Sequence, residues 1–265
     1  MSAAPNEPSR LKDLRQQVRL LLGLRDTITV DGVRYVERTH EPLRRALSKK
    51  GRGYKDYEVT FRSGERMRIR YAPSRIYADI AGPSALAPYR PADTLIRPGA
   101  RLLVIDAGTG FGAAWLVQRV GPAGAIVALE EDGESSHYAN RRYTLPNVAF
   151  ERGSTESLRG ELDGSFEGVV ALAVLRREHD ERAAQILELW RVLRPGGWML
   201  LGGPAAGEAI ATILIESGVQ NAEIATSEVV TRGPEGLMTF LVRKGVPTAS
   251  EFRSESEADE GPTDA

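Results

Sequence analysis

Between residues 100 and 245, short apolar runs alternate with longer segments whose apolar positions recur at helical spacing. The runs of strand length are Ala125–Leu129, Asn147–Glu151, Gly168–Leu175 and Trp198–Leu201. The segment Glu181–Leu193 has the period of an amphipathic helix, with Ala183, Ile186, Leu187, Trp190 and Leu193 on one stripe. Alternating buried strands and helices predict an α/β fold, a Rossmann-like doubly wound sheet.

The pattern changes near the end of the chain. After a predicted helix at 208–217, two strand-like segments, Ala222–Val230 and Leu237–Arg243, follow one another with only a Gly233–Gly236 turn between them. Two strands without an intervening helix predict an antiparallel hairpin that closes an otherwise parallel sheet.

The first 95 residues follow a different pattern. Leu11–Leu24 is typical of an amphipathic helix, and Thr27–Arg38 predicts a hairpin around Asp31-Gly32. Tyr57–Phe61 and Met67–Tyr71 alternate apolar and polar residues, which places Arg62, Arg66, Arg68 and Arg70 opposite the apolar face. We therefore expect a small α+β accessory region at 1–95.

Charge is divided unevenly between the two parts of the chain. Residues 1–100 hold 20 Lys and Arg against 11 Asp and Glu, whereas residues 101–265 hold 15 against 25. The segment 246–265 is acidic and almost free of apolar residues, which predicts a disordered tail. The sequence thus divides into a basic region at 1–95, a main domain at 96–245 and an acidic tail.

Composition excludes several kinds of site. The chain has no cysteine and three scattered histidines, so we expect no disulfide, no thiolate nucleophile and no metal site. No apolar run approaches the roughly 18 residues of a membrane helix, and the first residues lack a signal-peptide pattern. We expect a soluble, cytoplasmic protein without a membrane partner.

The main candidate for chemistry is the segment Val104–Gly112. Apolar residues lead into Asp106, and Gly108, Gly110 and Gly112 follow at alternate positions before an amphipathic segment. A strand, a glycine turn and a helix N-terminus form a site for a nucleotide-like cofactor. The same residues also fit the looser glycine pattern of dinucleotide-binding oxidoreductases. About 20 residues on, Glu130 ends the next predicted strand, where an acid can accept hydrogen bonds from ribose hydroxyls.

Three motifs together resemble the class I S-adenosylmethionine-dependent methyltransferases over residues 96–245. Asp106–Gly112 matches that family's D/E-x-G-x-G-x-G motif, Glu130 stands at its ribose-binding acid, and Arg191–Gly197 matches its R-V-L-K/R-P-G-G signature. The resemblance implies a seven-stranded sheet with an antiparallel edge hairpin, methyltransferase activity and S-adenosylmethionine as the cofactor. The signature and the hairpin argue against an oxidoreductase.

The resemblance also implies which residues hold the cofactor. Asp106 and the loop of Gly108, Thr109, Gly110 and Gly112 correspond to the methionine site, Glu130 to the ribose site, and Glu131 and Ser154 to the adenine site. Ser154 stands where the family usually has an acid, and its hydroxyl can accept the same hydrogen bond without charge assistance.

Methyl transfer needs in-line approach of the acceptor, and a base only where the acceptor must lose a proton. Glu178, His179 and Asp180 follow the fourth predicted strand and are the candidate bases. The alternative interpretation is a polar loop in which Asp180 caps the helix beginning at Glu181.

Absent motifs narrow the acceptor. The fourth strand lacks the N/D-P-P-Y/F motif of amino-group methylases, and no cysteine is present for cytosine-C5 methylation. We therefore expect a small-molecule acceptor. One alternative is an RNA or protein methyltransferase that uses the basic face of Arg62, Arg66, Arg68 and Arg70. The other is a non-catalytic binding protein on the same fold. RNA binding at low salt distinguishes the first alternative, and cofactor binding with turnover distinguishes the second.

Overall fold

The structure, a computed structural model, describes residues 27–37, 55–71, 82–204, 210–231 and 237–246, in two units, Met1–Ile80 and Ala81–Ala265. The predicted helix at Leu11–Leu24 and the acidic residues 247–265 lie outside the described residues. The sequence places the boundary after residue 95, whereas the structure assigns residues 81–95 to the second unit. The reason is that the 3-10 helix η1 (Gly82–Ala92) packs against three strands of that unit.

The first unit contains a four-stranded antiparallel sheet in the order β1-β2-β3-β4. Its strands are β1 (Thr27–Val30), β2 (Val33–Glu37), β3 (Lys55–Thr60) and β4 (Arg66–Tyr71). Asp31 and Gly32 join β1 to β2 with φ values of 48° and 77°, which is the left-handed turn that a two-residue hairpin requires. The hairpin that the sequence predicts around these two residues is therefore confirmed.

The two faces of this sheet differ as the alternation predicts. Val33, Tyr35, Tyr57, Val59 and Ile69 are buried, whereas Arg62, Arg66 and Arg68 are exposed. One acidic residue, Glu58, shares the arginine face. In the strand register Arg68 lies opposite Glu58, which also forms an ion pair with Arg66 at 3.8 Å. The face is therefore less positive than its arginines alone suggest.

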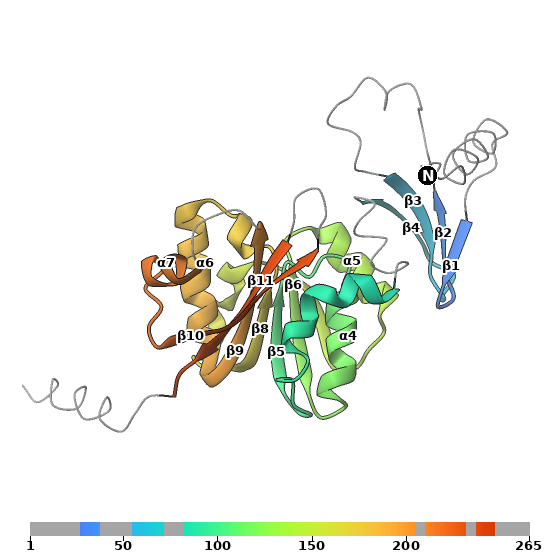
Figure 1. The fold of residues 1–265 in the computed structure, drawn as a ribbon. Coiled ribbons are helices and arrows are strands. Elements are labelled where there is room, and N and C mark those ends of the chain that lie inside the picture. The colour runs from blue at the N-terminus through green and yellow to red at the C-terminus, as the bar shows by residue number, and fades with distance from the viewer. Residues whose placement is uncertain (1–26, 38–54, 72–81, 205–209, 232–236, 247–265) are drawn as a thin grey trace, which may run out of the picture. The chain divides into compact units, whose positions relative to one another are not determined.

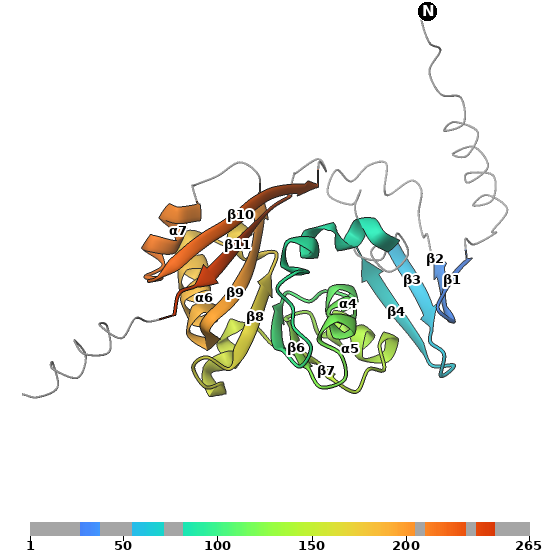
Figure 2. The ribbon, with the colours of Figure 1, turned by 60° about the horizontal axis from the view of Figure 1, so that its bottom comes forward.

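The second unit is built on a seven-stranded sheet in the order β10-β11-β9-β8-β5-β6-β7 (Figure 1). The strands β5 (Arg101–Ile105), β6 (Ala125–Glu130), β7 (Val148–Arg152), β8 (Phe166–Ala171) and β9 (Leu193–Pro204) are parallel. β10 (Ala222–Thr231) and β11 (Leu237–Lys244) form the antiparallel hairpin that the sequence predicts, beside β9 (Figure 2). The expected fold class is thus confirmed.

Helices cover both faces of the sheet. The helix α4 (Phe111–Val120) and η1 pack on one face, with α5 (Gly133–Arg142) contributing Ala139. The helices α6 (His179–Val192) and α7 (Ile210–Glu216) pack on the other face. Two short 3-10 helices, η2 (Thr155–Gly160) and η3 (Val174–Arg176), follow β7 and β8.

Two boundaries differ from the sequence prediction around α6. The predicted strand Gly168–Leu175 ends at Ala171, and its last apolar residues form η3, in which Val174 and Leu175 are buried. The helix begins at His179 rather than Glu181, and its buried face contains Gln185 and Leu189, whereas Leu187 is 48% exposed. Apolar character alone could not separate a strand from a buried 3-10 turn.

Candidate functional site

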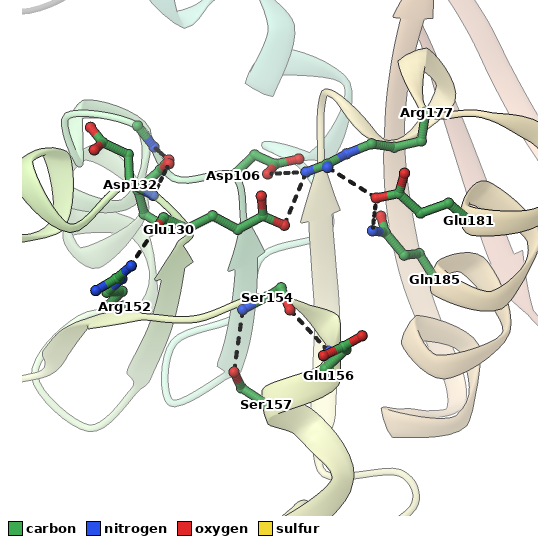
Figure 3. Close-up of polar contacts among 12 residues, drawn as sticks. Asp106, Glu130, Asp132, Arg152, Ser154, Glu156, Ser157, Arg177, Glu181 and Gln185 are labelled. Carbon is green, nitrogen blue, oxygen red and sulfur yellow. Dashed lines mark hydrogen bonds and ion pairs between the residues drawn. The ribbon is translucent and has the colours of Figure 1, made fainter.

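The order of the strands creates one point where connections leave in opposite directions. After β5 the chain continues to β6 and β7 on one side, while β8 and β9 lie on the other. The loops that follow β5 and β8 therefore diverge at the carboxyl edge, which is where open α/β sheets bind their ligands. The sequence-predicted residues Asp106 and Glu130 lie at this edge (Figure 3), and Gly108 contacts Glu130 there.

Glu130, the last residue of β6, is the central acid of the site. It is only 7% exposed, and its two carboxylate oxygens accept hydrogen bonds from two backbone N–H groups. Gly108 N donates to Oε2 at 2.6 Å and Asp132 N donates to Oε1 at 3.0 Å. These bonds fix the carboxylate against the glycine loop, and each oxygen retains a second lone pair for a ligand.

The three glycines of the loop have three different surroundings. A β-carbon on Gly108 would meet no atom within 4 Å, so this residue borders open space. A β-carbon on Gly110 would lie 2.7 Å from the Phe150 ring. One on Gly112 would collide with the Tyr89 side chain of η1. Only Gly108 thus leaves room for a ligand, while Gly110 and Gly112 allow the core and η1 to pack closely.

The backbone around these glycines is held in an uncommon conformation. Asp106 has φ 54° and Gly110 φ 83°, and Gly110 N donates to Ala107 O at 3.0 Å. Thr109 between them is buried. The N–H groups of Gly108 and Gly110 therefore already donate hydrogen bonds within the protein. What the loop exposes to the open space is the α-carbon of Gly108.

Arg177 is a site residue that sequence reasoning missed. It follows η3 and its guanidinium reaches three carboxylates, at 3.1 Å to Asp106, 3.3 Å to Glu131 and 3.0 Å to Glu181 (Figure 3). Partial burial opposes its charged form, but the attraction of the three carboxylates outweighs this, so the pKa of Arg177 is raised. The sequence feature that could have identified Arg177 is its position: it is a basic residue just after the fourth predicted strand, at the edge where a ligand is expected.

Ser154 has a structural task in this site. Its hydroxyl accepts a hydrogen bond from Glu156 N at 3.3 Å, and its own N–H donates to Ser157 Oγ at 3.2 Å. These are the reciprocal bonds of a capping box at the start of η2. The hydroxyl retains its own hydrogen and one lone pair for a ligand.

Two adjoining pockets open beside Ser154, of about 490 and 410 Å³. Glu131, Ser154 and Glu156 line both of them, and the second extends to Gln185 of α6. Gln185 is 8% exposed, and its Nε2 donates to Glu181 at 3.1 Å. Its Oε1 is buried and accepts no hydrogen bond from any described residue. Gln185 could not be recognised from the sequence, because it stands between apolar positions of the helix.

The candidate bases Glu178, His179 and Asp180 are exposed and stand at the start of α6. Glu178 occupies the N-cap position, so Asp180 lies in the first turn and does not cap the helix. The two ring nitrogens of His179 lie 3.2 Å from Asp180 Oδ1 and 3.2 Å from Glu216 Oε2. Hydrogen bonds to Asp180 and then Glu216 raise the pKa of His179 above 6.5.

Within the described residues, no group of histidine and acidic side chains is arranged to hold a metal ion. None of the described helices combines the length and apolar character needed to cross a membrane.

The central part of the chain is similar to known methyltransferases. Residues 103–197 match the model of a family described as a methyltransferase domain. A phthiotriol/phenolphthiotriol dimycocerosates methyltransferase of Mycobacterium ulcerans is 34% identical over 102 residues, covering 38% of this chain and 36% of that protein. A trans-aconitate 2-methyltransferase of Deinococcus radiodurans is 34% identical over 121 residues, covering 45% and 44%. The chain thus spans less than half the length of these relatives.

The fold has solved counterparts as well. A TehB-like S-adenosylmethionine-dependent methyltransferase from Corynebacterium glutamicum superposes with a TM-score of 0.51 at 17% identity, covering 64% of this chain and 93% of that structure. Residues 103–197 thus match a methyltransferase domain, and the seven-stranded sheet shares its fold with that solved methyltransferase.

Proposed function

We propose that this chain, whose central domain belongs to the class I S-adenosylmethionine-dependent methyltransferase superfamily, transfers a methyl group to a small-molecule acceptor. The observation that carries the proposal is the contact between Gly108 N and Glu130 Oε2 at 2.6 Å, at the edge where β5 and β8 diverge. It joins the glycine motif and the acid of the next strand into one binding surface.

The residues of the site fit this cofactor. Glu130 is oriented by two backbone N–H groups, and its remaining lone pairs suit the two hydroxyls of a ribose. Gly108 leaves open space beside it, which a β-carbon would fill. Asp106, Glu131 and Glu181 surround a single arginine. Their excess negative charge suits a ligand that carries a sulfonium and an ammonium group.

The adenine end is proposed for the pockets beside Ser154. Glu131 and Ser154 line both pockets, as the sequence motif implies for the two residues that flank the base. The buried Oε1 of Gln185 is an acceptor without a donor among the described residues. An exocyclic amino group would supply that donor, and this would offset the missing acid at position 154.

The chemistry that the cofactor supplies is an electrophilic methyl group. The protein's share is to orient the acceptor in line with it and to exclude water, for which no dedicated side chain is required. For an acceptor that must lose a proton, we propose Glu178, His179 or Asp180 as the receiving group, since these residues follow Arg177 at the same edge.

Two observations favour a small acceptor. The Mycobacterium ulcerans and Deinococcus radiodurans relatives are named for small-molecule substrates, phthiotriol or phenolphthiotriol dimycocerosates and trans-aconitate. In the arginine face of the first unit, Glu58 lies opposite Arg68 and pairs with Arg66, which weakens this face as a surface for the phosphates of RNA.

The test is calorimetric titration of S-adenosylhomocysteine and S-adenosylmethionine into the wild type and Glu130→Ala. Micromolar binding that weakens tenfold or more in the variant, about 1.4 kcal/mol, supports the cofactor site. Glu223→Ala, which removes an exposed carboxylate from β10, is the matched control. Turnover in a metabolite screen then identifies the acceptor. Absence of binding to the wild type overturns the proposal in favour of a non-catalytic protein.

A further inference from the structure

A further pocket, of about 360 Å³, lies at the opposite edge of the seven-stranded sheet from Glu130. It is formed where β8 and β9 begin and where the antiparallel β11 ends. Arg97, Arg194 and Arg243 line it, together with a single acid, Glu167, and the indole of Trp198. None of these residues belongs to the proposed cofactor site.

The sheet itself brings these side chains together. In the register of β9 and β11, Arg243 is directly opposite Trp198, so the two side chains leave the same face. In β8 the residue beside Trp198 is Gly168, and any β-carbon there would collide with the indole. The glycine therefore lets the ring lie flat against the strand as the floor of the pocket.

The pocket is rich in hydrogen-bond donors and poor in acceptors. Arg194 forms an ion pair with Glu167 at 2.5 Å, which is the pocket's one acidic side chain. Neither Arg97 nor Arg243 forms an ion pair with any carboxylate that the structure describes. Two guanidinium groups in the pocket are thus left without a counter-charge among the described residues.

Two buried donors add to this imbalance. Trp198 is 4% exposed and its Nε1 has no hydrogen-bond acceptor in the described part of the chain. The Nε atom of Arg194 is likewise buried without an acceptor there. A buried donor left without an acceptor costs about 1–3 kcal/mol, so a ligand oxygen that accepts a hydrogen bond from either group would be stabilised.

We propose that this pocket binds the phosphate group of a small molecule, at a site separate from methyl transfer. A phosphate offers several acceptor oxygens and a charge near −2, which matches the net charge of three arginines and one glutamate. The planar fork of each guanidinium fits phosphate oxygens in pairs. A volume of about 360 Å³ is large enough for a phosphomonoester.

The indole N–H provides a direct test. Three tryptophans, Trp115, Trp190 and Trp198, give three indole signals in a ¹H–¹⁵N spectrum of the full chain, and the Trp198 signal is the one lost in Trp198→Phe. We expect inorganic phosphate to change the chemical shift of the Trp198 indole signal. At constant ionic strength the change should fit a Kd for phosphate of about 1 mM or tighter, and the other two indole signals should shift less. Ribose 5-phosphate and citrate serve as parallel titrants.

Variants separate recognition from general charge. Arg194→Gln with Arg243→Gln should weaken phosphate binding at least tenfold, whereas Arg66→Gln, which removes an exposed charge from the other unit, should leave it unchanged. Tighter binding of ribose 5-phosphate than of phosphate identifies a phosphorylated metabolite as the ligand. Equal binding of the two identifies free phosphate.

Other results overturn the proposal. If the Trp198 signal does not shift at phosphate concentrations well above about 1 mM, no such site exists. If chloride or citrate shifts the Trp198 signal as much as phosphate does, the pocket does not select phosphate. Displacement of phosphate by single-stranded RNA, with a steep salt dependence, replaces the small ligand with a nucleic-acid backbone. Because cofactor titrations are read separately at Glu130, failure here leaves the methyltransferase proposal standing.

Discussion

The Nη2 atom of Arg177 lies 3.1 Å from the Oδ1 atom of Asp106, across 71 residues of sequence. This ion pair joins the loop after β8 to the loop after β5 at the point where the two strands diverge. The same guanidinium contacts Glu131 and Glu181. Arg177 thus partly neutralises a group of carboxylates at the proposed cofactor site, and its charge bears directly on which ligand binds there.

Removing this charge should change the preference between cofactor and product. In Arg177→Met the carboxylates lose their counter-charge, so the cationic S-adenosylmethionine should gain relative to S-adenosylhomocysteine, which lacks the sulfonium. We expect the ratio of the two Kd values to shift about threefold to tenfold, roughly 1 kcal/mol. Calorimetry with both ligands measures it, and Arg176→Met, an exposed neighbouring arginine, is the control. An unchanged ratio would mean that the ligand does not approach these carboxylates.

Alanine substitutions at two glycines of the motif should act on different properties. In Gly110→Ala the new β-carbon meets Phe150 at 2.7 Å with φ 83°, so stability should fall by about 1–3 kcal/mol. In Gly108→Ala the β-carbon enters open space with φ 58°, so stability should fall by only about 1 kcal/mol while cofactor affinity falls clearly. Urea unfolding and calorimetry on both variants separate the effects. If Gly108→Ala lowers cofactor affinity no more than Gly110→Ala does, the assignment of Gly108 to the ligand surface is contradicted.

Arg191 should be a main determinant of stability rather than of binding. Its guanidinium donates to Leu158 O at 3.0 Å, to Glu161 O at 2.8 Å and to Glu188 at 2.6 Å, which fastens α6 to η2 and the following loop. Arg191→Ala removes these charge-assisted bonds, and we expect a loss of about 2–3 kcal/mol in urea unfolding. Arg191→Lys should recover little of it, because one ammonium cannot reach three separate acceptors.

A matched control for Arg191 is Arg90→Ala, at an exposed position near the end of η1. It should lie within about 0.5 kcal/mol of the wild type. If Arg191→Ala unfolds at the wild-type urea concentration, the hydrogen bonds of its guanidinium contribute nothing to stability.

His179 should titrate above its ordinary pKa of 6.5, because Asp180 and Glu216 both stabilise its protonated form. A raised pKa in the folded state means that His179 contributes stability below pH 6.5 and that this contribution is lost as the pH rises through the folded pKa. An NMR titration of the ring protons measures the value directly. Glu216→Gln should lower it, and so should Asp180→Asn. A wild-type value at or below 6.5 would show that the two carboxylates do not pair with the ring in solution.

The sequence alone determined those features that depend on local patterns. Apolar runs and helical spacing predicted the alternating strands and helices, and the segment between Ala222 and Arg243 predicted the closing hairpin. Asp31-Gly32 predicted its own turn. The segment Asp106–Gly112 and Glu130 predicted the edge at which we propose the cofactor binds, because each motif lies at the end of a predicted strand. Periodicity and turn chemistry are set by neighbouring residues, so no tertiary information is needed to read them.

Tertiary structure decided which surface each motif residue presents. The three glycines look alike in the sequence, yet Gly110 faces Phe150 and Gly112 faces Tyr89, and only Gly108 faces open space. The partners of Arg177 come from β5, β6 and α6, and the pairing of Trp198 with Arg243 depends on the register of β9 with β11. Such contacts join residues that are distant along the chain. Burial and strand pairing fix them only when the whole sheet has formed, because packing between elements selects the facing side chains.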